Sequence, residues 1–239
     1  SSNATFTSNR NKVKRLASGS INPVTGEEIQ MDEMYVGWLG KENVAPRVIL
    51  TEGGSMTDIY VYNQLTRDNN GNIEVDQNGN ISMTTSSTPT KVGDLDADFN
   101  LGWTNHFTYK GIDLGVVLTA RVGGLAYSAT QGILDYYGVS ESSAIARDNG
   151  GVPVNNGTVE AQKYYQTIGT GEGGYGRYYL YSATNVRLQE LSLNYTLPKK
   201  WFKNVANVTL GVVGRNLWMI YCKAPFDPEL SASTSSNYY

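Results

Sequence analysis

The chain has 239 residues, of which 17% are charged, and it carries 26 Gly, 17 Tyr and a formal net charge of −3. One His and no excess of basic residues argue against nucleic-acid binding, and the single Cys222 excludes an internal disulfide framework and a cysteine-based zinc site. No stretch reaches 18 apolar residues, so the sequence predicts no transmembrane helix, and no apolar signal core is expected at the start. Membrane-spanning strands alternate polar and apolar residues, so a membrane location is not excluded.

The first part of the chain is polar and rich in turn-forming residues. Residues 3–16 predict a weak strand, marked by Phe6 and Val13. Short extended segments are expected at 35–39, 48–50 and 59–62, and the Ser- and Thr-rich residues 84–90 are expected to form a connector.

Residues 68–81 repeat Asn-Gly-Asn-Ile at a spacing of eight residues. The alternating Asp and Asn oxygens suggest a calcium loop. The EF-hand pattern, however, requires Gly at its sixth position, where this chain has Ile73 or Ile81. Asn-Gly is also the strongest two-residue hairpin signal. We therefore favour plain turns over a calcium site.

The clearest pattern is a hairpin at residues 99–122. Apolar residues fall on odd positions up to Tyr109 and on even positions from Ile112, with Lys110-Gly111 as a two-residue loop between them. This loop places Tyr109 opposite Ile112, so odd residues of one strand face even residues of the other. We therefore predict two apolar rows on one face of the hairpin.

Each strand of this hairpin has about eleven residues, which is close to the length of a tilted strand that crosses a bilayer. Two structures fit the pattern. One is half of a soluble β-sandwich, and the other is part of a transmembrane barrel whose apolar face meets lipid. In the barrel, the lipid-facing residues would be Phe99, Leu101, Trp103, Phe107, Tyr109, Leu114 and Leu118.

Residues 123–183 show no sustained period and are rich in Gly, Asn and Tyr. Tyrosine offers rigid, amphipathic contact area, so tyrosines of this span are candidates for binding a glycan or a peptide. The alternative is that they pack the loop against itself. The candidate ligand-binding residues are Tyr136, Tyr137, Tyr164, Tyr165 and Tyr175.

Alternation returns at Leu191, Leu193 and Tyr195, whereas Val186 and Leu188 occupy the other parity. This change predicts a β-bulge near residues 189–190. A turn at 198–204 and a final strand follow. Short and long connections therefore alternate, as they do in outer-membrane barrels, and aromatic residues fall near strand ends. These features favour the barrel over the sandwich.

Residues 185–201 (NVRLQELSLNYTLPKKW), 208–218 (VTLGVVGRNLW) and 224–230 (APFDPEL) resemble the C-terminal part of the SusC/RagA family of TonB-dependent outer-membrane importers. Residues 9–13, 91–93 and 109–111 resemble further family segments in the same order. The resemblance therefore extends over essentially the whole chain.

The resemblance implies an all-β fold, in which antiparallel strands of a transmembrane β-barrel carry long extracellular loops. Residues 1–239 would form part of one barrel domain, with 17–97 and 123–184 mainly outer loops. A plug domain and a TonB box are not recognisable, so a fragment of a longer protein is expected.

The implied function is active import of oligosaccharides or peptides across the outer membrane, without enzyme activity and without a cofactor. The implied partners are a SusD-like surface lipoprotein, the TonB complex acting through the plug, outer-membrane lipid and a glycan or peptide substrate, with no nucleic acid. The alternative is a soluble or surface-exposed β-rich module that binds glycan or peptide.

Several polar residues have two interpretations. Arg187 and Glu190 can pair across a lumen or only hold the strand register. Residues 227–229 (Asp-Pro-Glu) can line an outer vestibule or form an ordinary turn. His106 lies on the polar face without an acid or nucleophile at catalytic spacing, which favours a structural over a catalytic role.

Overall fold

The computed structural model describes residues 1–17, 19–39, 45–169 and 176–231. It divides into two compact units. The long-strand unit contains Ser1–Arg10, Asp96–Gly124 and Ser182–Leu230, and the mixed unit contains Asn11–Leu95 and Leu125–Tyr181. Each unit is described by itself.

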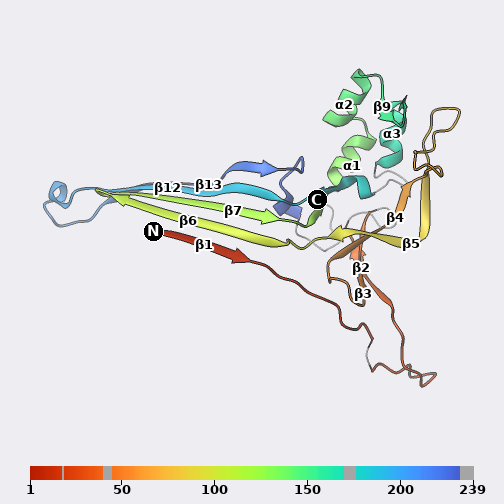
Figure 1. Ribbon diagram of the computed structural model, residues 1–239. Helices are drawn as coiled ribbons and strands as arrows, with labels where there is room; N and C mark the ends of the chain where they lie inside the picture. Colours follow the sequence, from red (N-terminus) through yellow and green to blue (C-terminus); the bar gives the residue numbers. More distant parts are fainter. Residues whose placement is uncertain (18, 40–44, 170–175, 232–239) are drawn as a thin grey trace. The chain divides into compact units, whose positions relative to one another are not determined.

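The long-strand unit is a five-stranded antiparallel sheet in the order β1-β6-β7-β12-β13 (Figure 1). Its four longest strands have 11 to 14 residues, well above the five or six of a usual strand. The predicted all-β antiparallel fold is confirmed. The strands are β1 (Ser2–Thr7), β6 (Phe99–Tyr109), β7 (Ile112–Val122), β12 (Asn185–Thr196) and β13 (Thr209–Cys222).

The predicted hairpin is formed by β6 and β7. Lys110 and Gly111 have φ angles of 47° and 86°, and two positive φ angles define the type I′ turn whose twist matches that of the strands. Tyr109 pairs with Ile112, and Trp103 pairs with Leu118. The predicted register is therefore confirmed.

The predicted bulge is present in β12. The register of this strand shifts between Leu188 and Glu190 against both of its neighbours, β7 and β13. On the β13 side, Asn216 has a φ of 50°, a left-handed conformation that Asn tolerates better than most residues. The shift returns Leu188 to the face that Leu191 occupies, which explains the change of parity in the sequence.

The two short connections of the sheet lie at one end. The β6–β7 turn and the 3₁₀ turn η2 (Lys199–Phe202), which precedes β13, are neighbours there, because the Thr196 N–H donates to the Gly111 carbonyl oxygen (2.7 Å). The chain leaves the sheet after β1 and after β7 at the opposite end (Figure 1). A further 3₁₀ turn, η3 (Pro228–Ser231), follows β13.

The N-terminal strand is shorter than predicted, because β1 ends at Thr7. Val13 does not continue the strand. Its N–H donates to the Gly54 carbonyl oxygen and its own carbonyl accepts from the Gly53 N–H, both at 2.8 Å. The expected strand beyond residue 7 is therefore wrong, since this backbone bonds to a turn of the mixed unit.

The mixed unit contains a four-stranded antiparallel sheet in the order β2-β3-β4-β5. The predicted connector at 84–90 is wrong, because these residues belong to β5 and pair with β4. Polar contacts hold this pairing: the Thr66 and Thr84 hydroxyls lie 2.7 Å apart, and Lys91 Nζ lies 2.7 Å from the buried Asp58. The strands are β2 (Glu33–Trp38), β3 (Arg47–Thr51), β4 (Asp58–Leu65) and β5 (Met83–Asp94).

The two Asn-Gly repeats form turns, as predicted. The Asp68 Oδ1 accepts hydrogen bonds from the backbone N–H groups of Asn70 and Asn72. Asp76 accepts equivalent bonds from Asn78 and Asn80. Each carboxylate thus closes its own turn, and these bonds lower the pKa of both carboxyls, with the Asn72 side chain as the main cause at Asp68.

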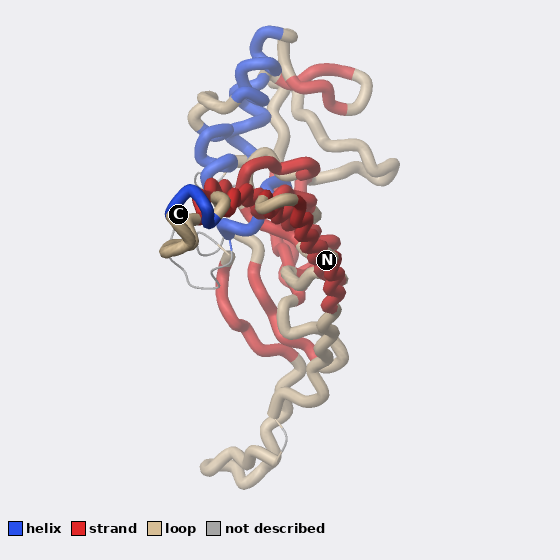
Figure 2. Tube along the Cα trace, turned by 90° about the vertical axis from the view of Figure 1, so that its left-hand side faces the viewer, coloured by secondary structure: helices blue, strands red, loops and turns tan. Residues whose placement is uncertain are grey.

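The described part of the span 123–183, for which the sequence indicated no regular structure, contains three helices of eight residues each. The first two begin at serine caps, where Ser128 and Ser140 each accept a hydrogen bond from a backbone N–H three residues later. The three helices lie together in Figures 1 and 2. They are α1 (Ala129–Tyr136), α2 (Glu141–Asp148) and α3 (Ala161–Ile168).

Short elements and a hydrophobic core complete the mixed unit. The core cluster includes Leu65, Tyr127, Ile168 and Tyr179, which come from the sheet and from the helical span. The remaining short elements are β8 (Leu125–Tyr127), which pairs with β11 (Leu180–Ser182), β9 (Val152–Val154), which pairs with β10 (Gly157–Val159), and the 3₁₀ turn η1 (Gly176–Tyr179).

Candidate functional site

The long sheet has one apolar face, which continues across its strands. Phe107 pairs with Leu114, and Leu114 pairs in turn with Leu193 of β12. Leu193 then pairs with Val212 of β13. The sequence-predicted lipid-facing residues Phe99, Leu101, Trp103, Phe107, Tyr109, Leu114 and Leu118 all lie on this face, which we call the apolar sheet face.

Large side chains of the apolar sheet face are exposed. The exposed fractions are 50% for Trp103, 59% for Phe107 and 76% for Val212. In soluble proteins such residues of a long strand are normally covered by a second layer. A contiguous exposed apolar surface of this kind marks a contact with a partner or with a membrane.

The opposite face of the sheet is polar. On it, the His106 ring and the Ser192 hydroxyl lie over Gly115, where a side chain would collide with the Ser192 oxygen. Among the described residues, no carboxylate accepts a hydrogen bond from the His106 ring, as one would to orient a general base. The arrangement agrees with a structural role for His106.

Arg187 anchors the segment that follows β13. The Arg187 side chain is buried, at 4% exposure, and its Nη1 and Nη2 donate to the two carboxylate oxygens of Asp227 at 3.1 and 2.8 Å. Glu229 Oε1 lies 3.4 Å from Nη2, and Asn185 Oδ1 accepts from Nε at 3.2 Å. The guanidinium is thereby compensated by two carboxylates, and its hydrogen bonds lower the pKa of Asp227.

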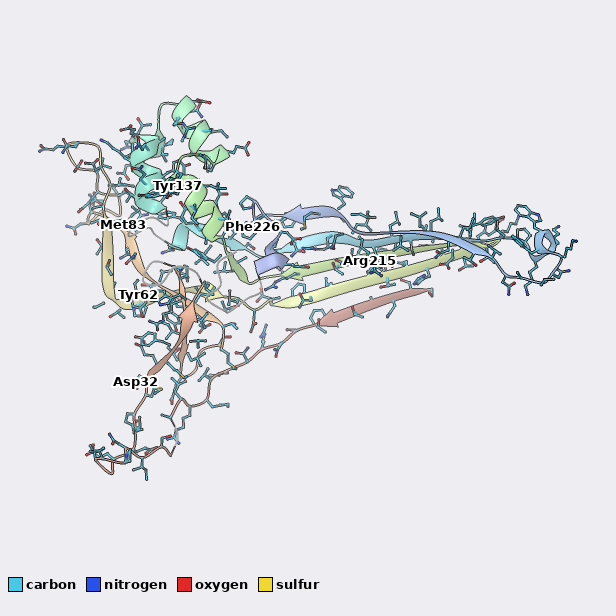
Figure 3. All side chains as sticks on the ribbon, turned by 180° about the vertical axis from the view of Figure 1, so that it is seen from behind. Asp32, Tyr62, Met83, Tyr137, Arg215 and Phe226 are labelled. Carbon is cyan, nitrogen blue, oxygen red and sulfur yellow. The ribbon has the colours of Figure 1, made fainter. Side chains whose placement is uncertain are left out.

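Glu190 has a separate partner. It is paired in register with Arg215 on β13, and Glu190 Oε2 accepts from Arg215 Nε at 2.9 Å. Figure 3 labels Arg215 on the sheet. Glu190 thus forms a cross-strand ion pair with Arg215, whereas Arg187 binds residues 227–229; that these residues hold the strand register stays a prediction.

The tyrosines singled out from the sequence gather at the helices of the mixed unit. Tyr136 and Tyr137, at the end of α1, meet edge to face with ring centroids 5.2 Å apart. Tyr164 and Tyr165 of α3 form a second edge-to-face pair at 5.4 Å. Figure 3 labels Tyr137 beside the helices. Tyr175 lies outside the described residues.

Three of these tyrosines line one cavity of about 470 Å³, which we call the tyrosine cavity. Its walls contain Tyr136, Tyr137 and Tyr165 but not Tyr164, and both Tyr164 and Tyr165 pack against the hydrophobic core. Tyr137 is 72% exposed, so its ring is available at the mouth of the cavity. Packing within the span is thus observed for Tyr164 and Tyr165, whereas ligand binding by these tyrosines stays a prediction.

Among the tyrosines that line this cavity, Tyr165 has a hydroxyl that is neutral at physiological pH. Burial raises the pKa of Tyr164 and of Tyr165. Burial also raises the pKa of Tyr181 to about 12. Neutral tyrosine hydroxyls both donate and accept hydrogen bonds, which suits neutral polar ligands.

The sequence analysis missed the polar residues of the tyrosine cavity. Asp135 is buried and accepts from Gln131 Nε2 (3.1 Å) and Ser142 Oγ (2.9 Å), while Arg147 donates to the Gly138 carbonyl oxygen. Gln162 and Gln166 complete the polar lining. The Ser-capped starts of two short helices were the signals that would have placed these residues on helix faces.

A second cavity, of about 720 Å³, lies between the two Asn-Gly turns and the β9–β10 hairpin. Its acidic lining residues are Asp68, Glu74 and Asp76, and the two aspartates already accept hydrogen bonds from their own turns. Within the described ranges, no three His, Cys, Asp or Glu side chains gather where they could ligate a metal ion. We therefore place the candidate ligand site in the tyrosine cavity.

None of the described helices has the length and apolar character needed to cross a membrane. No protein-family model matches the chain. In sequence, the chain is 25% identical to TonB-dependent receptor P3 of Formosa agariphila over an alignment of 244 residues. This alignment covers 97% of the chain and 23% of that receptor.

Solved structures show the same fold. The RagAB peptide transporter aligns with a TM-score of 0.60 and 17% identity, and the RagAB peptide importer in its closed-closed state aligns with a TM-score of 0.57 and 18% identity. Each alignment covers 95% of this chain and 24% of the other chain. The chain thus spans about a quarter of the length of the proteins that it matches.

Proposed function

Because this chain is a SusC/RagA-like segment of the TonB-dependent transporter fold, we propose that it forms part of the wall and outer vestibule of an outer-membrane importer. In this proposal the long-strand unit belongs to the barrel wall. Residues 17–97 and 123–184 are mainly extracellular loops, and the plug lies outside this segment.

The observation that carries the proposal is the exposed apolar sheet face. It extends over strands of 11 residues or more and contains large side chains such as Trp103, Phe107 and Leu210, all at least half exposed. In a barrel, lipid covers this face, and the polar face with His106 and Ser192 lines the interior. Lipid contact at Phe99, Leu101, Trp103, Phe107, Tyr109, Leu114 and Leu118 remains a prediction.

The lengths of the connections support which end of the sheet faces the periplasm and which faces the outside of the cell. The two short turns, at Lys110–Gly111 and η2, lie at one end of the sheet, and the chain leaves for its long excursions at the other end. Bacterial barrels keep short turns on the periplasmic side and long loops outside. The tyrosine cavity lies in one of these excursions, so it would face the medium.

We infer that the tyrosine cavity contacts the imported substrate, which is an oligosaccharide or a peptide. Tyr137 offers an exposed aromatic face, and Asp135, Gln162 and Arg147 offer hydrogen bonds around it. One similar structure is described as a peptide transporter. Import would be energised by TonB acting through the plug, and a SusD-like surface lipoprotein would be the partner in capture.

The first experiment is an immunoblot of fractionated source cells, with antibodies against this segment and with samples run boiled and unboiled. A barrel should appear in the outer-membrane fraction with heat-dependent mobility and a mass well above 26.1 kDa. A soluble or released band near that mass would overturn the barrel. It would leave the alternative, a soluble glycan- or peptide-binding module.

A second experiment addresses the substrate contact. Uptake or binding of oligosaccharides and peptides is compared between the wild type and the Tyr136→Ala/Tyr137→Ala variant. Loss for one substrate class, with unchanged outer-membrane level, supports the proposal. Unchanged uptake of every substrate that the cell imports through this protein would remove the tyrosine cavity from the function.

A further inference from the structure

Four lysines surround the short turns of the long sheet. Lys110 lies in the β6–β7 turn, Lys199 and Lys200 lie in η2, and Lys203 follows it. The two turns are neighbours, as the 2.7 Å hydrogen bond from Thr196 to Gly111 shows, and Figure 1 places them at the same end of the sheet. We call these residues the turn lysine cluster.

The turn lysine cluster is strongly cationic relative to the chain. Residues 108–113 and 196–209 contain these four lysines and one carboxylate, Asp113, which gives them a formal net charge of +3, whereas the whole chain carries −3. Asp113 Oδ2 accepts from the Thr108 hydroxyl (2.8 Å). Among the described residues, none of the four ammonium groups forms an ion pair, and all four side chains are exposed.

Large apolar side chains lie among these lysines. Tyr109, Trp201 and Val205 are 67%, 65% and 87% exposed. The Lys110 Nζ lies 5.1 Å from the centroid of the Tyr109 ring, so cation and ring are adjacent. Tyrosine and tryptophan beside lysine are the residues that occupy the boundary between acyl chains and headgroups.

Backbone hydrogen bonds fix the shape of the second turn. The N–H groups of Lys203 and Asn204 donate to the carbonyl oxygens of Lys200 and Lys199, at 3.3 and 3.0 Å. Lys203 and Asn204 both have left-handed backbones, with φ angles of 52° and 62°. Three lysines and Trp201 are thus presented together on a hydrogen-bonded turn.

We propose that the turn lysine cluster binds the headgroups of anionic phospholipids, with Trp201 and Tyr109 inserted at the boundary of the acyl chains. The charge of the site is complementary to a phosphodiester, and the exposed apolar side chains favour a ligand that also carries acyl chains over a free anion. The proposal rests on the barrel assignment, which places this end of the sheet at the periplasmic leaflet. It adds a lipid-binding site to the importer.

The test uses the protein extracted from its membrane in detergent. Native mass spectrometry measures binding of phosphatidylglycerol and of phosphatidylcholine with the same acyl chains. The variant is Lys199→Gln/Lys200→Gln/Lys203→Gln. The control, Lys12→Gln/Lys14→Gln/Lys223→Gln, removes the same charge from exposed lysines outside these turns.

The wild type should bind phosphatidylglycerol more tightly than phosphatidylcholine. A basic residue near a lipid surface contributes about fivefold in affinity, so the triple variant should lose at least about tenfold for phosphatidylglycerol. The control should keep wild-type affinity. Millimolar inorganic phosphate should not displace the lipid, because phosphate lacks acyl chains.

Equal affinity of the wild type for both lipids would overturn the proposal, as would unchanged phosphatidylglycerol binding in the triple variant. Preference for lipopolysaccharide would also contradict it, since that result would place the short turns at the outer leaflet. Heat-dependent mobility of each variant reports barrel formation separately. Failure of the lipid site is therefore distinguishable from failure of the barrel.

Discussion

The substitution Trp103→Lys tests whether the apolar sheet face contacts lipid. The expected loss of unfolding free energy follows from the depth at which Trp103 would lie in the bilayer. The strand β6 has 11 residues, so at about 3.4 Å per residue and a tilt of about 40° it crosses about 28 Å, close to the apolar band of a barrel. Trp103 is one residue from the strand centre, which places it within about 3 Å of the midplane. Trp103→Lys should therefore cost about 2–4 kcal/mol.

Three matched variants isolate this effect. Trp103→Leu removes the hydrogen bond from the indole N–H to Ser2 Oγ (3.0 Å) but keeps an apolar side chain, so its difference from Trp103→Lys reports the charge. Tyr109→Lys places the same charge at the strand end, where the cost should be about 0–1 kcal/mol. Thr104→Lys places it at similar depth on the polar face, where a small cost is also expected.

The assay is guanidinium-induced unfolding of the protein in lipid vesicles, followed by loss of heat-dependent mobility on gels. If the apolar sheet face contacts lipid, Trp103→Lys should lower the free energy of unfolding most and Tyr109→Lys less. Trp103→Leu and Thr104→Lys should remain near the wild type. Equal costs at positions 103 and 109 would refute depth dependence. A large cost at Thr104 together with none at Trp103 would mean that the two faces had been assigned in reverse.

Three further predictions follow from named contacts. Asp227→Asn removes one of two carboxylates from the buried Arg187 and should cost about 1–3 kcal/mol in the same assay. Arg187 lowers the pKa of Asp227 in the folded protein below the value of about 4 that it has in the unfolded chain. The ion pair therefore stabilises the fold at any pH above about 4, and this stabilisation is lost as the pH falls through the lower pKa of the folded state. The Asp227→Asn variant should lack this loss of stability in acid. Tyr137→Ala should change the free energy of unfolding by no more than about 0.5 kcal/mol, since the residue is 72% exposed, but it should weaken substrate binding in a titration. The control Val139→Ala should change neither the free energy of unfolding nor substrate binding. Gly111→Ala should lower the free energy of unfolding by about 1–2 kcal/mol, because φ is 86° and the new Cβ would lie 2.9 Å from the Thr196 carbonyl oxygen. The control Gly79→Ala has a φ of 73° but open space around the new Cβ, so it should lower stability less, as measured by thermal unfolding.

The sequence predicted those parts of the fold in which the periodicity is local and long. In the β6–β7 hairpin, the parity switch across Lys110-Gly111 determines every pairing, because a two-residue loop allows one register. The bulge in β12 was visible for the same reason, since one added residue reverses the parity of the apolar residues.

Elements held by long-range or polar contacts were not predicted. The strand β5 has few apolar residues, and its pairing with β4 depends on hydroxyl contacts and on the ion pair between Lys91 and Asp58. The helices α1 to α3 have eight residues each, too short for a helical period to stand out from the surrounding Gly and Asn. For the tyrosine cavity, the sequence therefore indicated the tyrosines but not the polar residues. Tyrosines are recognisable by residue type, whereas Asp135 and Arg147 become neighbours only once the helices form.

Ion pairs of the long sheet connect the three segments that resemble the SusC/RagA family. The three resembling segments follow one another within residues 185–230: Arg187 of the first binds Asp227 and Glu229 of the third, and Glu190 of the first binds Arg215 of the second. Both pairs flank the bulge at residues 188–190, where β12 loses regular hydrogen bonding to β7 and β13. A bulge that shifts register on both sides requires side-chain contacts to specify one alignment. The charged residues of these motifs thus act together on the geometry of the long sheet, and we expect reversal of one pair, Glu190→Arg with Arg215→Glu, to preserve folding better than either change alone.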